Sequence, residues 1–248
     1  MPFRNERHFL LSLFPCYFIM QKLIQLLFLF FSCSLLAQND SIPDFDAIDY
    51  KYREDQFYIT LTYNILQNRP LGITQNSFSA GINAGFLRDF PINKSRTFAV
   101  APGLGFSFSN YKENMLVDDT SGEIVYSKLS PDVTFDRNKL ALYSVDFPIE
   151  FRWRTSTPQS HKFWRIYTGA KFSYLFYSES RYVDNSRSIT IKNNPDLNKL
   201  QYGAYVAAGY NSWNLYVYYG FSKLFSKPLD ETTRGFNTLN VGFMFYIL

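Results

Sequence analysis

A two-residue alternation of apolar with small or polar side chains recurs through the chain after residue 55. In the first such segment the apolar face comprises Phe57, Ile59, Leu61, Tyr63 and Ile65, and the other face Tyr58, Thr60, Thr62 and Asn64. Successive side chains of a β-strand point to opposite faces, so the pattern predicts a strand with one apolar face. Seven further segments repeat it, near residues 78–86, 98–109, 141–154, 164–176, 200–210, 213–222 and 238–247. The sequence therefore predicts an all-β chain of eight antiparallel strands, with a bulge or kink at Pro102, which lacks a ladder donor.

The links between these segments alternate in length. Three are short (residues 91–96, 155–161 and 211–212), and four are longer and polar (residues 67–76, 111–138, 179–198 and 226–235). Outer-membrane barrels have short periplasmic turns and longer extracellular loops, and their strands need about 9–11 residues to cross the bilayer. The chain is therefore predicted to form an eight-stranded antiparallel transmembrane β-barrel, with both termini in the periplasm.

The second face of the strands is rich in Gly, Ser and Ala, which suits the crowded lumen of a small barrel. The same face carries charged residues that we expect to form a paired, structural network inside the lumen: Asp146, Glu150, Arg152, Arg154, Arg165 and Lys171. A buried charge without a partner costs several kcal/mol, so pairing is expected. The alternative is a soluble β-sandwich, in which these charges would face water.

An export segment precedes the barrel. A charged start at Lys22, an apolar run over residues 23–37 and a small residue at Ala37 are typical of a secretory signal peptide. We predict a signal peptide over residues 1–38, with Met20 as a candidate true start, a short periplasmic segment over residues 39–54 and the barrel over residues 55–248. The alternatives are an uncleaved membrane helix and a lipoprotein modified at Cys33.

Composition and motifs favour neither nucleic-acid binding nor catalysis. The formal net charge is +4 without a clustered basic footprint, and both cysteines lie in the export segment. Ser160 beside His161 is a weak hydrolase candidate, and lumenal Asp146 and Glu150 are weak acid–base candidates. The acidic pairs at 118–119 and 230–231 lack the spacing of a calcium loop. We expect no cofactor, no metal, no small-molecule substrate and no enzymatic activity.

Several segments resemble PorT-like outer-membrane proteins of Bacteroidetes. The similar stretches are YREDQFY at residues 52–58, GINAGFLRD at 81–89 with PIN at 91–93, and APGLG at 101–105. The chain ends in Ile247 and Leu248 and lacks the terminal Phe common among outer-membrane proteins. The resemblance implies a non-enzymatic accessory or assembly role in type IX protein secretion, with outer-membrane lipid and other secretion-system envelope proteins as partners.

A side-chain-filled barrel of eight strands cannot pass a folded protein, so any such role must act through surfaces. The alternative function is a structural or adhesive barrel of the OmpA/OmpX type that binds external ligands through its long loops. A lumenal enzyme and a narrow porin are further alternatives.

Overall fold

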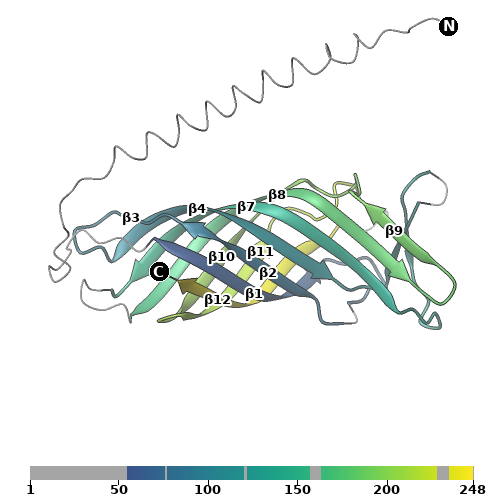
Figure 1. Ribbon diagram of the computed structural model, residues 1–248, viewed down its shortest axis with the longest axis horizontal. Coiled ribbons are helices and arrows are strands. Elements are labelled where there is room, and N and C mark those ends of the chain that lie inside the picture. Colours follow the sequence, from purple (N-terminus) through teal and green to yellow (C-terminus); the bar gives the residue numbers. More distant parts are fainter. Residues whose placement is uncertain (1–54, 76, 120–121, 157–162, 228–234, 248) are drawn as a thin grey trace, which may run out of the picture. The chain divides into compact units, whose positions relative to one another are not determined.

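Eight long antiparallel strands form a closed barrel in the computed structural model, which describes residues 55–247 except 76, 120–121, 157–162 and 228–234. The barrel strands are β1 (Gln56–Gln67), β2 (Ala80–Leu87), β4 (Phe98–Tyr111), β7 (Arg137–Arg154), β8 (Trp164–Val183), β10 (Leu200–Tyr210), β11 (Trp213–Gly220) and β12 (Asn237–Ile247). Each pairs with the next along the chain, and β12 pairs with β1 to close the ring (Figure 1). The predicted fold class is therefore confirmed.

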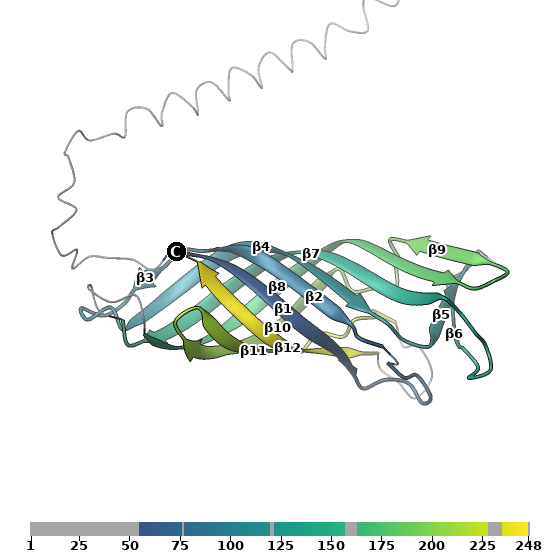
Figure 2. The ribbon, with the colours of Figure 1, turned by 60° about the horizontal axis from the view of Figure 1, so that its bottom comes forward.

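Four shorter strands were not predicted from the alternation. They are β3 (Phe90–Pro91), β5 (Met115–Asp118), β6 (Val125–Lys128) and β9 (Ser188–Lys192). Strand β3 continues the ladder of β2 along β4, β5 and β6 form a separate hairpin, and β9 pairs with the far end of β8. Strands β5, β6 and β9 lie at one end of the barrel, here called the loop end, and β3 lies at the other, the turn end (Figure 2).

The alternation sorts the side chains as the sequence predicts. In β1 the side chain of Phe57 is 60% exposed, whereas its neighbour Tyr58 is 4% exposed. Apolar residues face outward on all eight strands, and small, polar or charged residues face the lumen. A soluble sandwich has the opposite arrangement, with its apolar side chains inside. An apolar exterior around a polar interior is the arrangement of a membrane barrel.

Of the bulge or kink predicted at Pro102, the bulge is wrong. Pro102 pairs with Ile149 and Gly105 pairs with Asp146, which is the same register on either side of the proline. The proline lacks a donor, but its carbonyl still accepts a hydrogen bond from the Arg88 amide at 2.9 Å, so the strand stays in register. The register shift lies instead between β7 and β8, beside Tyr143.

The polarity of the strands reverses near the loop end. On β7 the inward side chains Ser144 and Asp146 are polar, but Leu142 and Leu140, two and four residues from Ser144, are buried and apolar. Beyond Tyr143 the outward series passes through the small residue Ala141 and becomes charged at Lys139 and Arg137. A membrane protein faces lipid with apolar side chains only within the bilayer, so the reversal marks where β7 leaves the apolar layer.

Several predictions fall outside the described residues. These are the signal peptide (1–38), the segment 39–54, Ser160, His161 and the acidic pair at 230–231. The predicted domain boundaries stay predictions. Among the described residues, no helix has both the length and the hydropathy to cross a membrane.

Candidate functional site: a filled lumen and an ordered loop end

Glu150 of β7 is the centre of one lumenal cluster. One carboxylate oxygen accepts hydrogen bonds from the hydroxyls of Tyr205 (2.8 Å) and Tyr246 (2.9 Å). The other accepts from Nε of Arg152 at 2.8 Å, and both members of that ion pair are fully buried. Strand β7 contributes Glu150 and Arg152, and β10 and β12 contribute one tyrosine each, so the cluster connects three parts of the wall across the lumen.

Asp89 forms a second centre that the sequence pattern did not single out. Arg154 donates to both of its carboxylate oxygens, at 2.9 and 2.8 Å, and Nη1 of Arg152 donates to one of them at 2.9 Å. Paired contacts of this kind are the strong form of the arginine–carboxylate interaction. Arg152 therefore connects Asp89 to Glu150. Because Asp89 lies between β2 and β3, outside a regular strand, the alternation gave no sign of where it points.

Lys171 and Asp146 form a separate pair nearer the middle of the barrel. The Lys171 ammonium lies 3.5 Å from Asp146, and the Ser107 hydroxyl donates to the same carboxylate at 3.1 Å. The ammonium also lies 4.4 Å from the ring centre of Tyr218, which adds a cation–π contact.

Arg165 is buried but has no ion pair with a described acid. Its guanidinium lies over the rings of Phe163 (4.4 Å), Tyr246 (5.3 Å) and Tyr167 (5.7 Å). The six charged residues predicted for the lumen are thus all buried on its inner face. Five enter ion pairs, in two separate sets, and Arg165 rests on aromatic rings instead. That they serve as a structural network is our proposal.

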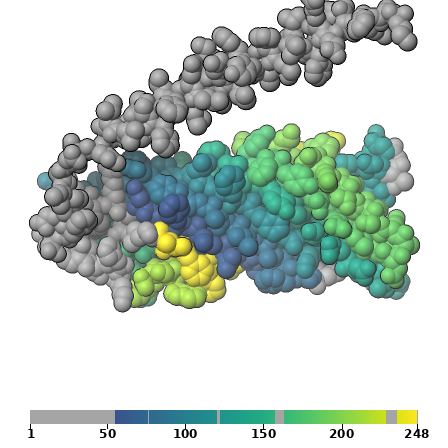
Figure 3. All heavy atoms as spheres, in the orientation of Figure 1, coloured from purple at the N-terminus to yellow at the C-terminus, as the bar shows by residue number. Residues whose placement is uncertain are grey.

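Aromatic side chains complete the filling of the lumen. An inner cluster contains Tyr58, Tyr167, Tyr205, Tyr216, Tyr218 and Tyr246, of which Tyr205, Tyr218 and Tyr246 were not assigned inward from the sequence. Tyr205, Tyr218 and Tyr246 each lie two residues from an inward-facing residue of the same strand (Gly203, Gly220 and Met244). The two-residue alternation could therefore have placed them in the lumen. A hollow of about 10 Å³ remains among these side chains, roughly the room of one water molecule. On the face seen in Figure 3 the described side chains form a continuous wall.

The lumen has acids and bases but lacks the geometry of a catalytic set. Asp146 and Glu150, the weak acid–base candidates, each lie against a cation. The hollow beside Asp146 has room for about one water molecule and not for a substrate. No group of three or more potential metal ligands occurs among the described residues, which include Asp118 and Asp119. The expectation that the chain is not an enzyme stays a prediction.

An apolar cluster closes the loop end of the barrel. Its buried members come from barrel strands and from the long links: Leu66, Ile73, Tyr111, Met115, Val117, Leu140, Leu142, Leu175, Ile191, Leu197, Leu224, Phe225 and Phe236. Residues of β5 and β9 take part, so these links are folded onto the barrel. Burial of so many apolar side chains stabilises one arrangement of the loops.

Strand β9 forms the edge of a sheet that extends past the barrel. Two backbone hydrogen bonds flank the β8–β9 ladder: the Asn193 N–H donates to the Ser178 carbonyl, and the Asp184 N–H donates to the Arg187 carbonyl. In the register of this ladder, Ile189 and Ile191 are therefore the residues of β9 that bond to β8. The residues between them, including Thr190, direct their backbone N–H and C=O groups away from β8, because bonding alternates along an antiparallel strand. No described strand pairs with this outer side.

Comparison with known proteins gives a family match. Residues 36–226 match the outer membrane protein beta-barrel domain family. No curated protein matched. Among solved structures, Ail, the attachment invasion locus protein of Yersinia pestis, is similar, with a TM-score of 0.41 and 15% identity over 79% of this chain and 99% of that chain.

Proposed function

The chain belongs to the outer membrane protein beta-barrel domain family, and from that premise we propose that it is an adhesive or recognition barrel that binds a protein ligand through its loop end. The observation that carries this proposal is the contrast between a lumen occupied by paired charges and packed tyrosines and a loop end folded around an apolar cluster. A barrel filled in this way offers its partners surfaces and not a channel. The folded loops are its most elaborate surface. The proposal places the loop end outside the cell and both termini in the periplasm.

The edge of β9 suggests how a ligand would bind. Ile189 and Ile191 pack onto the apolar clusters and hold β9 in place. Among the described residues, no strand pairs with the outer edge of β9, so its backbone N–H and C=O groups are available there. An extended segment of a partner can add a strand to such an edge through main-chain hydrogen bonds. The ligand we propose is accordingly a protein with an accessible extended segment.

Type IX secretion remains the alternative function. The PorT-like stretches at residues 52–58 and 81–89 support it, and its partners would be other envelope proteins of the secretion system. Such partners would contact the turn end or the periplasmic segment. The two functions therefore predict different sensitive surfaces on the same barrel.

Attachment of cells displaying the barrel tests the adhesive function. Gram-negative cells expressing the chain, or an empty vector, are applied to immobilised collagen, fibronectin, laminin and uncoated plastic. We expect stronger attachment to at least one protein-coated surface. Thr190→Pro should abolish this gain, because it removes an outward-facing edge N–H while leaving the β8 ladder intact. The matched variant Thr190→Val keeps that N–H and should attach like the wild type.

The outcomes separate the possibilities. Equal attachment of expressing and empty cells would reject adhesion to these ligands. Gain of attachment that survives Thr190→Pro would retain adhesion but reject the β9 edge. In the native host, a deletion strain that attaches normally but no longer exports its secreted proteins would favour the secretion role.

A further inference from the structure

A row of cations crosses three neighbouring strands on the outer surface near the loop end. Lys139 of β7 pairs directly with Arg181 of β8. Tyr111, the last residue of β4, pairs with Leu140. In the same register the next residue, Lys112, lies opposite Lys139 and continues the row on the side away from Arg181. The inward neighbours Tyr111, Leu140 and Tyr182 are buried, and therefore the cations face outward. Like charges directly opposite on paired strands destabilise the sheet unless an anion lies between them.

The row lies a short distance beyond an aromatic row on the same strands. Phe108 contacts Tyr143, whose ring is 5.0 Å away, and Tyr143 contacts Tyr177 at 5.5 Å. Tyr143 and Lys139 are four residues apart on β7, which is about 13 Å along a strand. For a strand tilted by about 45°, this separation is roughly 9 Å along the bilayer normal. Aromatic residues mark the boundary of the apolar layer in such barrels. The cations are thus at the level of lipid headgroups.

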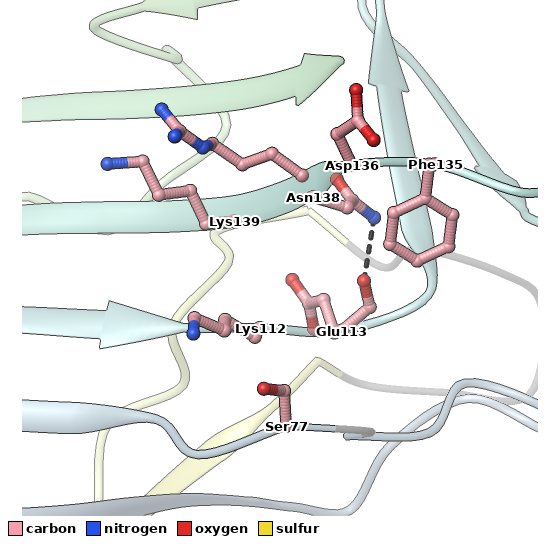
Figure 4. A pocket seen from close by; sticks show the side chains of 8 residues that line it. Ser77, Lys112, Glu113, Phe135, Asp136, Asn138 and Lys139 are labelled. Atoms are coloured by element: carbon pink, nitrogen blue, oxygen red, sulfur yellow. Dashed lines mark hydrogen bonds between the residues drawn. The ribbon is translucent and has the colours of Figure 1, made fainter. Parts of the chain in front are cut away.

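Lys112 and Lys139, but not Arg181, border a hollow near the loop end. It has a volume of about 370 Å³ and is lined by Ser77, Lys112, Glu113, Phe135, Asp136, Arg137, Asn138 and Lys139. In Figure 4 the side chains of Lys112 and Lys139 lie on two neighbouring segments and both extend away from Phe135. The Asn138 amide donates to the backbone carbonyl of Glu113, which fixes the two segments that form the hollow.

The cations have no acidic partner of their own. No ion pair within 4 Å joins Lys112, Lys139 or Arg181 to a described residue, and Nε of Arg181 is buried without a hydrogen-bond partner. Asp136 also lines this hollow, but it forms no ion pair with these cations among the described residues. Two further acids nearby are engaged or neutral. Glu179 accepts from the Tyr177 hydroxyl at 3.2 Å. Burial raises the pKa of Glu113 to about 8, with Arg69 opposing the shift, so Glu113 is mostly uncharged at neutral pH.

We propose that Lys112, Lys139 and Arg181, with Arg137 at the rim, bind the phosphate groups of a phosphorylated glycolipid in the outer leaflet. The anion would lie between the like charges and supply the missing partner for Arg181. Arginine and lysine together suit phosphate, the first by paired hydrogen bonds and the second as a point charge. The proposal rests on the outer-membrane location and on the outward orientation of the loop end, but not on adhesion.

Lipid retention by the whole chain tests this proposal. The protein is reconstituted in phosphatidylcholine nanodiscs doped with bisphosphorylated lipid A or with the same lipid after dephosphorylation, and bound lipid is measured by native mass spectrometry. We expect preferential retention of the phosphorylated form. The triple variant Lys112→Gln, Lys139→Gln, Arg181→Gln should lose affinity on the order of a hundredfold, given the usual attraction of each cation to an anionic surface.

A matched triple variant controls for net charge. Lys192→Gln, Lys199→Gln and Lys223→Gln remove three cations of the loop end outside the row and should leave retention unchanged. Heat-modifiable mobility on gels shows that each variant is folded. Equal retention of both lipids, or equal loss in both triple variants, would overturn the proposal. Displacement of the lipid by millimolar inorganic phosphate would also overturn it, since the site would then take free phosphate.

Discussion

The lumen and the loop end are closed by opposite kinds of side chain. In the lumen, Asp89, Glu150 and Arg152 are fully buried and paired, whereas at the loop end Leu142 and Phe236 belong to an apolar cluster. The same strands run through both regions. Lipid already covers the apolar face in the first region, so the interior there must satisfy polar groups internally. In the second region water surrounds the strands, and an ordinary apolar core forms inside them.

This difference teaches that one β-strand can obey two burial rules along its length. On β7 the rule changes beside Tyr143, where the register between β7 and β8 also shifts. At this shift β8 contains one more residue than β7, as in a β-bulge. The outward cation Lys139 lies just beyond this point. Both the apolar cluster and the cation row therefore lie where the strands leave the apolar layer.

The largest effect is expected from breaking a buried charge pair in the lumen. Asp89→Asn leaves Arg152 and Arg154 without their shared carboxylate, and removing one partner of a buried pair costs about 3–5 kcal/mol. The free energy of unfolding is measured by urea titration in detergent micelles, using tryptophan fluorescence.

The matched control is Asp55→Asn. Asp55 pairs with Arg88, whose side chain is 51% exposed, and the amide oxygen of the variant can still accept from the Asp89 backbone. Exposed pairs contribute about 0–1 kcal/mol, so the loss should be small. Similar losses at positions 55 and 89 would show that the lumen is more hydrated than its packing indicates.

A smaller effect is expected from truncating the apolar cluster. Leu142 is 4% exposed, and Leu142→Ala should lower the free energy of unfolding by about 2–4 kcal/mol through lost burial and a residual cavity. The same truncation at Leu104, which is 51% exposed on the outer face of β4, removes contacts with detergent only. The urea titration should therefore show a clearly smaller loss for Leu104→Ala. If Leu104→Ala costs as much, the two burial rules do not differ.

Strand parity predicted the barrel and the inner face but not the details of the filling. The positions of Glu150, Arg152 and Lys171 followed from the alternation alone. Asp89 did not, because it lies between two strands where parity carries no information. Tyr205 and Tyr246 were missed for another reason: aromatic residues are typical of the lipid face, although parity places these two inside.

The loop end was less predictable than the lumen. Strands β5 and β9 lie in links whose sequences are polar overall, and their order comes from contacts with distant residues such as Leu66 and Phe236. No local pattern carries that information. The reversal on β7 was also hidden, because Ala141 continues the outward series and yet is only 2% exposed. A period of two specifies a face but not the solvent beyond it.

Glu113 provides the smallest and most specific test of the comparison. The lumenal acids Asp89 and Glu150 each face a cation, whereas one carboxylate oxygen of Glu113 is buried without a hydrogen-bond partner. Burial, opposed by Arg69, raises the pKa of Glu113 to about 8, compared with 4.5 for an ordinary glutamate. The folded state therefore holds this proton more tightly than the unfolded state does. Its contribution to stability falls as pH rises from about 5 to about 8, and the loss is complete above that range.

Between pH 6 and pH 7.5, the free energy of unfolding should accordingly fall by about 2 kcal/mol relative to Glu113→Gln, since one pKa unit corresponds to about 1.4 kcal/mol. The variant keeps the shape of the side chain but cannot ionise, so it serves as the matched reference in the same urea titrations. Parallel pH profiles for the two proteins would mean that Glu113 is hydrated and ionised in the folded state. In that case water would reach Glu113 at the loop end. The difference from the lumen would then apply only to the residues of the apolar cluster.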